Sequence, residues 1–344
     1  MPSVRSFNDS SAVSLAYALG NGNAAADFSG QTFNYIPYTG EKFQMAKTPK
    51  MSTAITSDRR PSRSKNTKGS ASGGVTMEFG GPQFILDMLS MTLLEDWKNV
   101  DDLDLTKGVF LLDGELKKYM CVEKTVRDGP LDTDTLYHER YYATAVSSGE
   151  IKFADGDIIT LDVSTMSVGA DYSEAAAGVG GLGGSIAGSK VTPLSYEPAD
   201  SSNNLTSIVL KNAQGTPMEV EFSDLSISIQ NNVREQSALG RQFAAGVGFG
   251  KISVTLSGEI YFFDQSVLAA HMENERLSAE FTIDTEEGVF HFVLPSLSAQ
   301  TPTNNSEGEN QDYKTKLTLQ GERGTATIDA TPYECCMAVT FIPV

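Results

Sequence analysis

Short runs in which apolar and polar side chains alternate, or in which β-branched and aromatic side chains gather, recur along most of the chain. Residues 225–229 (LSISI) alternate one for one, and this period places the apolar side chains on one face of a strand. Asp155 and Gly156 separate two such runs and predict a hairpin turn. The pattern predicts an all-β protein. The other strands predicted in this way are residues 75–79 (VTMEF), 158–163 (IITLDV), 252–256 (ISVTL), 289–294 (VFHFVL) and 314–319 (KTKLTL).

Two short helices interrupt the predicted strands. In residues 82–94 (PQFILDMLSMTLL) a proline lies in the first turn, and Ile85, Met88 and Leu89 recur at helical spacing. Residues 264–272 (DQSVLAAHM) open with Asp264, a favourable N-cap residue. Each helix follows a predicted strand.

These strand–helix pairs form an internal repeat. In the first half, Val75 precedes a Gly-Val-Phe motif at Gly108 by 33 residues. In the second half, Val254 precedes the same motif at Gly288 by 34 residues. We therefore predict two tandem β-sandwich or barrel units, each with a flanking α-helix, and the repeat would let a trimer mimic a hexamer. The predicted segments are 1–50 (a polar N-terminal arm that orders on a neighbour, and a first strand), 51–190 (unit A), 191–204 (a linker) and 205–344 (unit B).

The charge of the chain excludes one class of function. Among 344 residues, 26 are Lys or Arg and 44 are Asp or Glu, which gives a net charge of −18. Sequence-specific nucleic-acid binding depends on cations that neutralise phosphates, so this chain is a poor candidate for it. Like charge instead repels a polyanion, which is useful where DNA has to slide past.

Targeting signals and disulfides are also not expected. Residues 1–20 lack a basic region followed by an apolar one, and the most apolar stretch, 84–94, is short and contains Asp87. Cys121, Cys335 and Cys336 are odd in number and include an adjacent pair, which is not a disulfide framework. We therefore expect the chain to fold in a reducing cytoplasm.

Motifs that resemble cofactor or metal sites fail on their context. Residues 178–183 (GVGGLG) match a dinucleotide fingerprint but lack the preceding buried strand, and we interpret them as a loop. In residues 183–190 Ser189 precedes Lys190, the reverse of the order in a phosphate-binding loop. We therefore expect no enzyme activity, no cofactor and no metal. The acidic run of Asp101, Asp102 and Asp104 lacks the spacing of a calcium-binding loop. The histidines lack the spacing of metal ligands; they are His138, His271 and His291.

One cationic cluster stands out in this acidic chain, in a polar loop ahead of the first central strand. It can contact phosphate, or it can pair with acidic surface on a neighbouring subunit, and we favour the second hypothesis. A shorter Arg-bearing loop occupies the matching place in the second half. The candidates for contacts between subunits or rings are Arg59, Arg60, Arg63, Lys65, Lys68, Arg234 and Arg241.

In the first half, residues 74–79 (GVTMEF), a helix and residues 120–124 (MCVEK) follow one another. In the second half, residues 225–232 (LSISIQNN) and 250–258 (GKISVTLSG) follow in order. This order of elements, over residues 40–344, resembles the siphophage tail tube (major tail protein) family.

The resemblance implies a structural protein of the virion tail, assembled in the host bacterial cytoplasm. Members form stacked rings around a lumen, with the sheets of neighbouring units joined into a barrel. The implied partners are other copies of the chain, a tape-measure protein inside the tube, tail terminator and tail-tip proteins at its ends, and double-stranded DNA in passage, with no membrane partner.

Acidic side chains on the predicted strands are the candidates for lining the lumen, and a position on the outside of the tube is the alternative for each. Glu219 and Glu221 share one face of the strand predicted to open the second unit. The full set of lumen candidates is Glu78, Asp157, Asp162, Glu219, Glu221 and Glu259.

Two other functions stay open at this point. A tail-associated or receptor-binding β-sandwich module would share the fold without forming tubes. A hydrolase on a β-scaffold would need clustered titratable groups with shifted pKa values.

Overall fold

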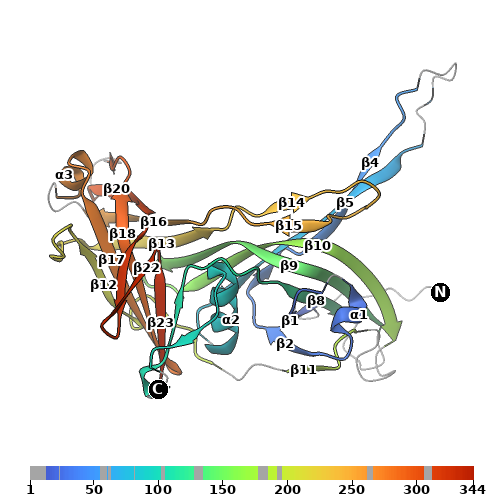
Figure 1. Cartoon of the computed structure of the whole chain (residues 1–344), viewed down its shortest axis with the longest axis horizontal. Coiled ribbons are helices and arrows are strands. Elements are labelled where there is room, and N and C mark those ends of the chain that lie inside the picture. The colour runs from blue at the N-terminus through green and yellow to red at the C-terminus, as the bar shows by residue number, and fades with distance from the viewer. Residues whose placement is uncertain are drawn as a thin grey trace.

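The computed structural model describes residues 13–22, 24–54, 60, 63–80, 82–101, 105–127, 135–176, 185–191, 196–261, 266–305 and 312–344. Most of these residues lie in strands, and the helices among them are short, so the prediction of an all-β protein with short helices is confirmed. Figure 1 shows an elongated molecule in which the N-terminal half lies beside the C-terminal half and a two-stranded arm projects from one end.

The N-terminal half contains three long strands, β5 (Lys65–Glu78), β9 (Thr135–Ala154) and β10 (Thr160–Ala176), together with shorter strands and the helices. The helices here are α1 (Ala25–Phe28), α2 (Pro82–Leu93) and the 3-10 helix η2 (Leu105–Lys107). The shorter strands are β1 (Val13–Leu19), β2 (Thr32–Ile36), β3 (Gly40–Glu41), β4 (Gln44–Lys50), β6 (Lys98–Asn99), β7 (Val109–Leu112), β8 (Met120–Arg127) and β11 (Ser189–Val191).

The C-terminal half contains one helix among its described residues, α3 (Ser266–Met272). Its strands are β12 (Leu205–Lys211), β13 (Phe222–Gln230), β14 (Arg234–Gln236), β15 (Gly246–Gly248), β16 (Ser253–Tyr261), β17 (Arg276–Thr285), β18 (Gly288–Ala299), β19 (Thr303–Asn305), β20 (Lys314–Gly321), β21 (Gly324–Ile328), β22 (Thr331–Cys335) and β23 (Ala338–Pro343).

One antiparallel sheet runs through both halves in the order β5–β10–β9–β13–β16–β20. The β9–β13 pairing joins the halves over seven residue pairs, from Asp224 opposite Ala154 to Gln230 opposite Ser148. One row of apolar side chains crosses all six strands and is almost fully buried. Its members are Met77, Leu161, Ile151, Ile227, Leu256 and Leu319.

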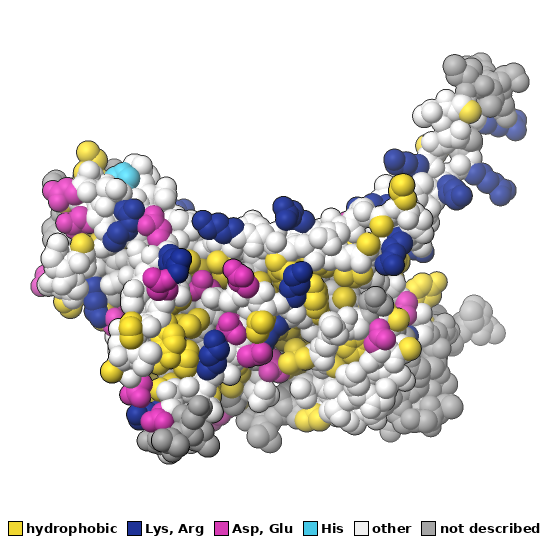
Figure 2. Space-filling view, viewed as in Figure 1, with side chains coloured by type: hydrophobic (Ala, Val, Ile, Leu, Met, Phe, Trp, Pro, Cys, Tyr) yellow, Lys and Arg dark blue, Asp and Glu magenta, His cyan; other side chains and the backbone are white. Residues whose placement is uncertain are grey.

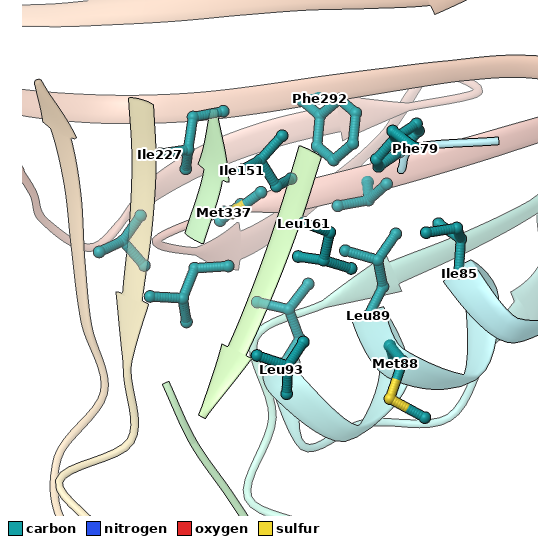
Figure 3. Packing of buried hydrophobic residues seen from close by; sticks show 14 of the residues in the cluster. Phe79, Ile85, Met88, Leu89, Leu93, Ile151, Leu161, Ile227, Phe292 and Met337 are labelled. Atoms are coloured by element: carbon teal, nitrogen blue, oxygen red, sulfur yellow. The ribbon is translucent and has the colours of Figure 1, made fainter. Parts of the chain in front are cut away.

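The sheet buries this row against helix α2 and against a second layer of strands. Ile85 and Leu89 of α2 point toward Leu161 of β10, and Phe79 lies edge-on to Phe292 (Figure 3). A helix with one apolar stripe needs such a surface, and these α2 side chains are fully buried. The second layer consists of β11–β2–β1–β8 on one side and β12–β17–β18–β23–β7 on the other, where β7 comes from the N-terminal half. It continues from the central sheet through the β8–β9 and β18–β20 pairings.

The end strands of the central sheet show that it does not close within one chain. Among the described strands, β4 pairs only with β5, and β19 pairs only with β20. The sheet is therefore an open one with free edges at β4 and at β19, while residues 319–321 of β20 pair with β18 of the same chain.

The structure tests several of the expectations from the sequence. Every strand predicted by alternation is present, Asp155 and Gly156 form the β9–β10 turn, and α2 occupies the predicted helix. Asp264, the expected cap of α3, lies outside the described residues. Residues 178–183 and Asp102 and Asp104 lie outside them as well.

The expectation of an N-terminal arm that orders only on a neighbour is wrong for the described residues from 13 to 43, while β4 lies in the projecting arm. Strand β1 pairs with β2 and β8, and Leu15 and Tyr17 are fully buried. The Tyr17 hydroxyl donates a hydrogen bond to Asp87 of α2 at 2.6 Å. These contacts make the segment part of the core, which its many small and polar residues concealed.

Candidate functional site

One face of the six-stranded sheet carries small polar and charged side chains, and we call it the polar face. Along β16 buried and partly exposed residues alternate, so Thr255 and Ser257 lie opposite the core. Directly opposed residues of antiparallel neighbours share a face, which extends this pattern across the sheet. Two rows of it cross all six strands: Glu78, Thr160, Lys152, Ser226, Ser257 and Thr318, then Thr76, Asp162, Glu150, Ser228, Thr255 and Gln320.

The lysine at the centre of the polar face is paired with carboxylates. Lys152 donates a hydrogen bond to Asp162, and its ammonium lies 3.3 Å from the Glu150 carboxylate. Burial raises the pKa of Asp162, but hydrogen bonds from Lys152 and Thr76 outweigh burial and hold the pKa below its ordinary value. The hydrogen bond to Asp162 raises the pKa of Lys152 in turn. The lysine is therefore charged and engaged within the face.

A second lysine at the edge of the face is held in the same manner. The ammonium of Lys314 lies 3.9 Å from the Glu259 carboxylate and donates a hydrogen bond to Ser223 at 3.1 Å. It also lies 5.2 Å from the centre of the Tyr261 ring. Carboxylates thus compete with any incoming phosphate for this cation.

The projecting arm differs sharply from the rest of the molecule in charge. We call β4, the outer part of β5 and the described residues between them the basic arm (residues 44–54, 60 and 63–70). These described residues include no acid, and their cations are Lys47, Lys50, Arg60, Arg63, Lys65 and Lys68. Figure 2 shows Lys and Arg along the arm, while Asp and Glu are frequent at the opposite end of the molecule. Two paired strands with no core beneath them are only marginally stable alone.

A second hairpin, β14–β15, rests on the base of the basic arm. The amide of Gly69 donates a hydrogen bond to the Gln242 carbonyl at 2.7 Å, and Lys68 pairs with Glu235 at 2.7 Å. A Cβ at Gly69 would lie 2.7 Å from the Phe243 ring, so only glycine permits this crossing. The crossing fixes the direction in which the arm leaves the sheet.

A family model described as phage tail tube protein matches residues 46–322, which is most of the chain. The chain belongs to the phage tail tube protein family. It is a component of the phage tail, and the family is structural. A search of curated proteins found no match.

In this tail tube protein, three of the six acids predicted for the lumen share the polar face: Glu78, Asp162 and Glu259. Asp157 lies in the exposed β9–β10 turn. The prediction that Glu219 and Glu221 share a strand face is wrong, because β13 begins after them. The amide of Val220 bonds to the Met218 carbonyl at 3.1 Å, and this tight turn interrupts the ladder.

The cations predicted for contacts between subunits lie on two hairpins, the basic arm and β14–β15. Lys65 and Lys68 lie in strand β5 rather than in a loop, and Lys68 pairs within its own chain. Arg59 lies outside the described residues. The others are Arg60 and Arg63, which are exposed on the basic arm, Arg234, which is exposed in β14, and Arg241, which is exposed beyond the hairpin tip.

Sequence reasoning missed part of the polar face. Ile151 and Phe153 are buried and alternate with Glu150 and Lys152, so the signal was present in residues 150–153. Asp224 also lies on this face, opposite Glu259. Their place beside β13 depends on a pairing between strands far apart in the sequence.

Neither a membrane-spanning helix nor a cluster of metal ligands is found among the described residues. None of their helices is long and apolar enough to cross a membrane. Nowhere in the described part of the chain do three His, Cys, Asp or Glu side chains converge as metal ligands.

Proposed function

We propose that this tail tube protein assembles into stacked rings that form the hollow conduit for DNA in a siphophage tail, with three copies in each ring. The observation that carries the proposal is the central sheet, which passes without a break from one half of the chain to the other through β9 and β13. The chain thus already contains one junction of the kind that a ring needs repeatedly.

The two free edges supply the remaining junctions. An unpaired edge strand exposes backbone donors and acceptors and invites another strand. In the proposed ring, the β19 edge of one copy pairs with the β4 edge of the next, and the closed barrel has no edge left. Cyclic closure of this kind uses the same two surfaces in every copy.

The internal repeat supports a trimer with pseudo-six-fold symmetry. In both halves a central strand leads into a helix, β5 into α2 and β16 into α3. If each half occupies one sixth of the ring, three chains complete it. Six chains per ring would place the second half on the outside as a decoration.

The polar face suits the inside of such a tube. Its serines, threonines and carboxylates form no continuous cationic groove for phosphates: Lys152 and Lys314 lie beside carboxylates, and the exposed Lys316 is directly opposite Glu259 in the register. During assembly in the host cytoplasm a tape-measure protein occupies this lumen, and terminator and tip proteins close the ends. DNA later slides through without being held.

The basic arm suits contacts between copies. Its cations project away from their own acidic body, and the acidic end of a neighbour offers the complementary charge. Such pairing lets copies with a net charge of −18 stack in spite of their mutual repulsion.

Electron microscopy of the purified protein over a range of concentrations, with mass photometry alongside, tests the proposal. We expect hollow tubes or stacked rings, with three chains counted in each ring. Six chains in each ring would rule out the trimer. A monodisperse particle that forms no rings, even with salt added to screen the acidic charge, would favour the receptor-binding module.

A further inference from the structure

The tip of the β14–β15 hairpin presents a large apolar side chain with nothing around it. Leu239 is fully exposed, and Gly240 beside it has a φ of +81°, which closes the turn. Arg241 lies two residues after Leu239 and is exposed, while Arg234, also exposed, opens β14 five residues before it. Arginine is enriched at protein interfaces, and here it lies beside a fully exposed apolar side chain, which suits contact with a protein surface.

Helix α3 shows a matching surface at the other end of the molecule. Val267 and Ala270 are buried against the sheet, and a ring nitrogen of His271 bonds to the Ala299 carbonyl at 2.8 Å, so the helix is fixed in place. Leu268 and Met272, four residues apart and therefore on one face, are 39% and 75% exposed. By contrast, helix α2, which follows the corresponding strand in the first half of the chain, is largely buried.

Charge complementarity connects these two surfaces. Glu273 follows Met272 directly and is exposed, and Glu275, two residues further on, is partly exposed. Arg241 at the hairpin tip has the opposite sign. Figure 1 places α3 and the hairpin tip far apart, so they cannot meet within one chain. A contact between them is head-to-tail, and repetition of a head-to-tail contact generates a ring where the rotation closes and an open filament where it does not.

We propose that the β14–β15 tip of one copy docks on the exposed face of α3 in a neighbouring copy. Leu239 packs against Leu268 and Met272, and Arg241 lies beside Glu273 and Glu275. This inference rests on the proposed function, since it names one contact that holds copies together in the tube.

Assembly of surface variants gives the first test. Leu239→Ser and Met272→Ser should each raise the protein concentration needed for tube formation at least tenfold. Both side chains are exposed, so the melting temperature of the unassembled protein should stay unchanged. The matched control is Ile342→Ser, which removes an apolar side chain that is 41% exposed beside another acidic turn and should leave assembly unaltered. Arg241→Glu should weaken assembly, and adding Glu273→Arg should restore it.

Disulfide trapping gives the second test. In a Cys336→Ser background, where Cys121 and Cys335 stay buried, the pair Leu239→Cys and Met272→Cys is oxidised after assembly. We expect a ladder of covalently linked chains, which either cysteine alone should not give. Tubes that form without a ladder, and equally well with Leu239→Ser, would overturn this contact and leave the tube intact. Failure of the wild-type chain to assemble would contradict the proposed function itself.

Discussion

At the scale of single residues, Glu123 is buried in a polar cluster that fastens one segment to the sheet. Its carboxylate, which is 0% exposed, lies 2.8 Å from the ammonium of Lys190. It also accepts hydrogen bonds from the hydroxyl of Ser185 at 2.5 Å and the amide of Ile186 at 3.1 Å. Burial raises the pKa of Glu123, but Lys190 and these hydrogen bonds outweigh burial, so the pKa is lowered. The cluster holds residues 185–191 beside β2.

The lowered pKa fixes the pH dependence of this attachment. Its contribution to stability is present above the unfolded-state pKa of about 4.3 and is lost as pH falls through the lower folded-state value. We expect hydrogen exchange in residues 185–191, corrected for the intrinsic rate, to rise below about pH 4 before exchange in β9 rises. Glu123→Gln should lower the free energy of unfolding by about 3 kcal/mol, because Lys190 loses its counter-charge. Glu123→Gln with Lys190→Met should cost less, and equal losses would contradict the pairing.

Substitutions at Gly108 and Gly156 allow the cost of backbone strain to be measured apart from the cost of a steric clash. Gly108 has a φ of +84°, and a Cβ there would lie 2.1 Å from the Phe341 carbonyl oxygen. Gly156 has a φ of +69° with nothing within 4 Å of a Cβ. Gly156→Ala should therefore cost about 1 kcal/mol of unfolding free energy, and Gly108→Ala about 3 kcal/mol or more. Chemical denaturation measures both, and equal losses would show that the Gly-Val-Phe motif is not constrained by β23.

At the scale of elements, the strength of each local pattern decided what could be predicted from the sequence. The alternation in residues 225–229 and the apolar stripe of α2 are strong local signals, and both elements form as predicted. The outer part of β5 (KNTKGS) is polar on both faces, so its apolar and polar residues do not alternate, and the sequence predicts a loop there. Tertiary pairing with β4 makes it a strand.

The polar face was likewise predictable only where a local pattern determines it. Alternation alone assigns Glu78, Asp162 and Glu259 to a side of their strands. No local pattern brings Glu150 beside Ser228, since that contact depends on the register between β9 and β13. The sequence also concealed the turn at Val220, which removes two predicted acids from β13.

The proposed role of the polar face leads to a prediction about DNA passage. Glu150→Gln, Asp224→Asn and Glu259→Gln together should leave tubes intact but slow DNA ejection severalfold, because repulsion falls and nearby lysines lose their partners. The matched control neutralises three exposed acids that lie in connections outside the six strands, Glu115→Gln, Asp157→Asn and Glu286→Gln. Ejection rates of phages carrying each tail measure the difference. Equal rates for both triple variants would place the polar face away from the DNA.

At the scale of the whole molecule, the chain has the features of a subunit and not of a finished particle. Its central sheet ends in two free edges, its basic arm projects without a core, and its charge is divided between a basic end and an acidic one. Each feature is a liability in a monomer and is resolved by neighbouring copies. The central claim is therefore that the six-stranded sheet becomes part of a closed wall with its polar face inward.

A helical reconstruction of assembled tubes by electron cryomicroscopy tests that claim most directly. We predict a hollow tube in which β4 of one copy pairs with β19 of the next and the side chains of Glu78, Asp162 and Glu259 point into the lumen. A tube whose lumen is lined by other strands, with the polar face on the outside or against another sheet, would contradict the account.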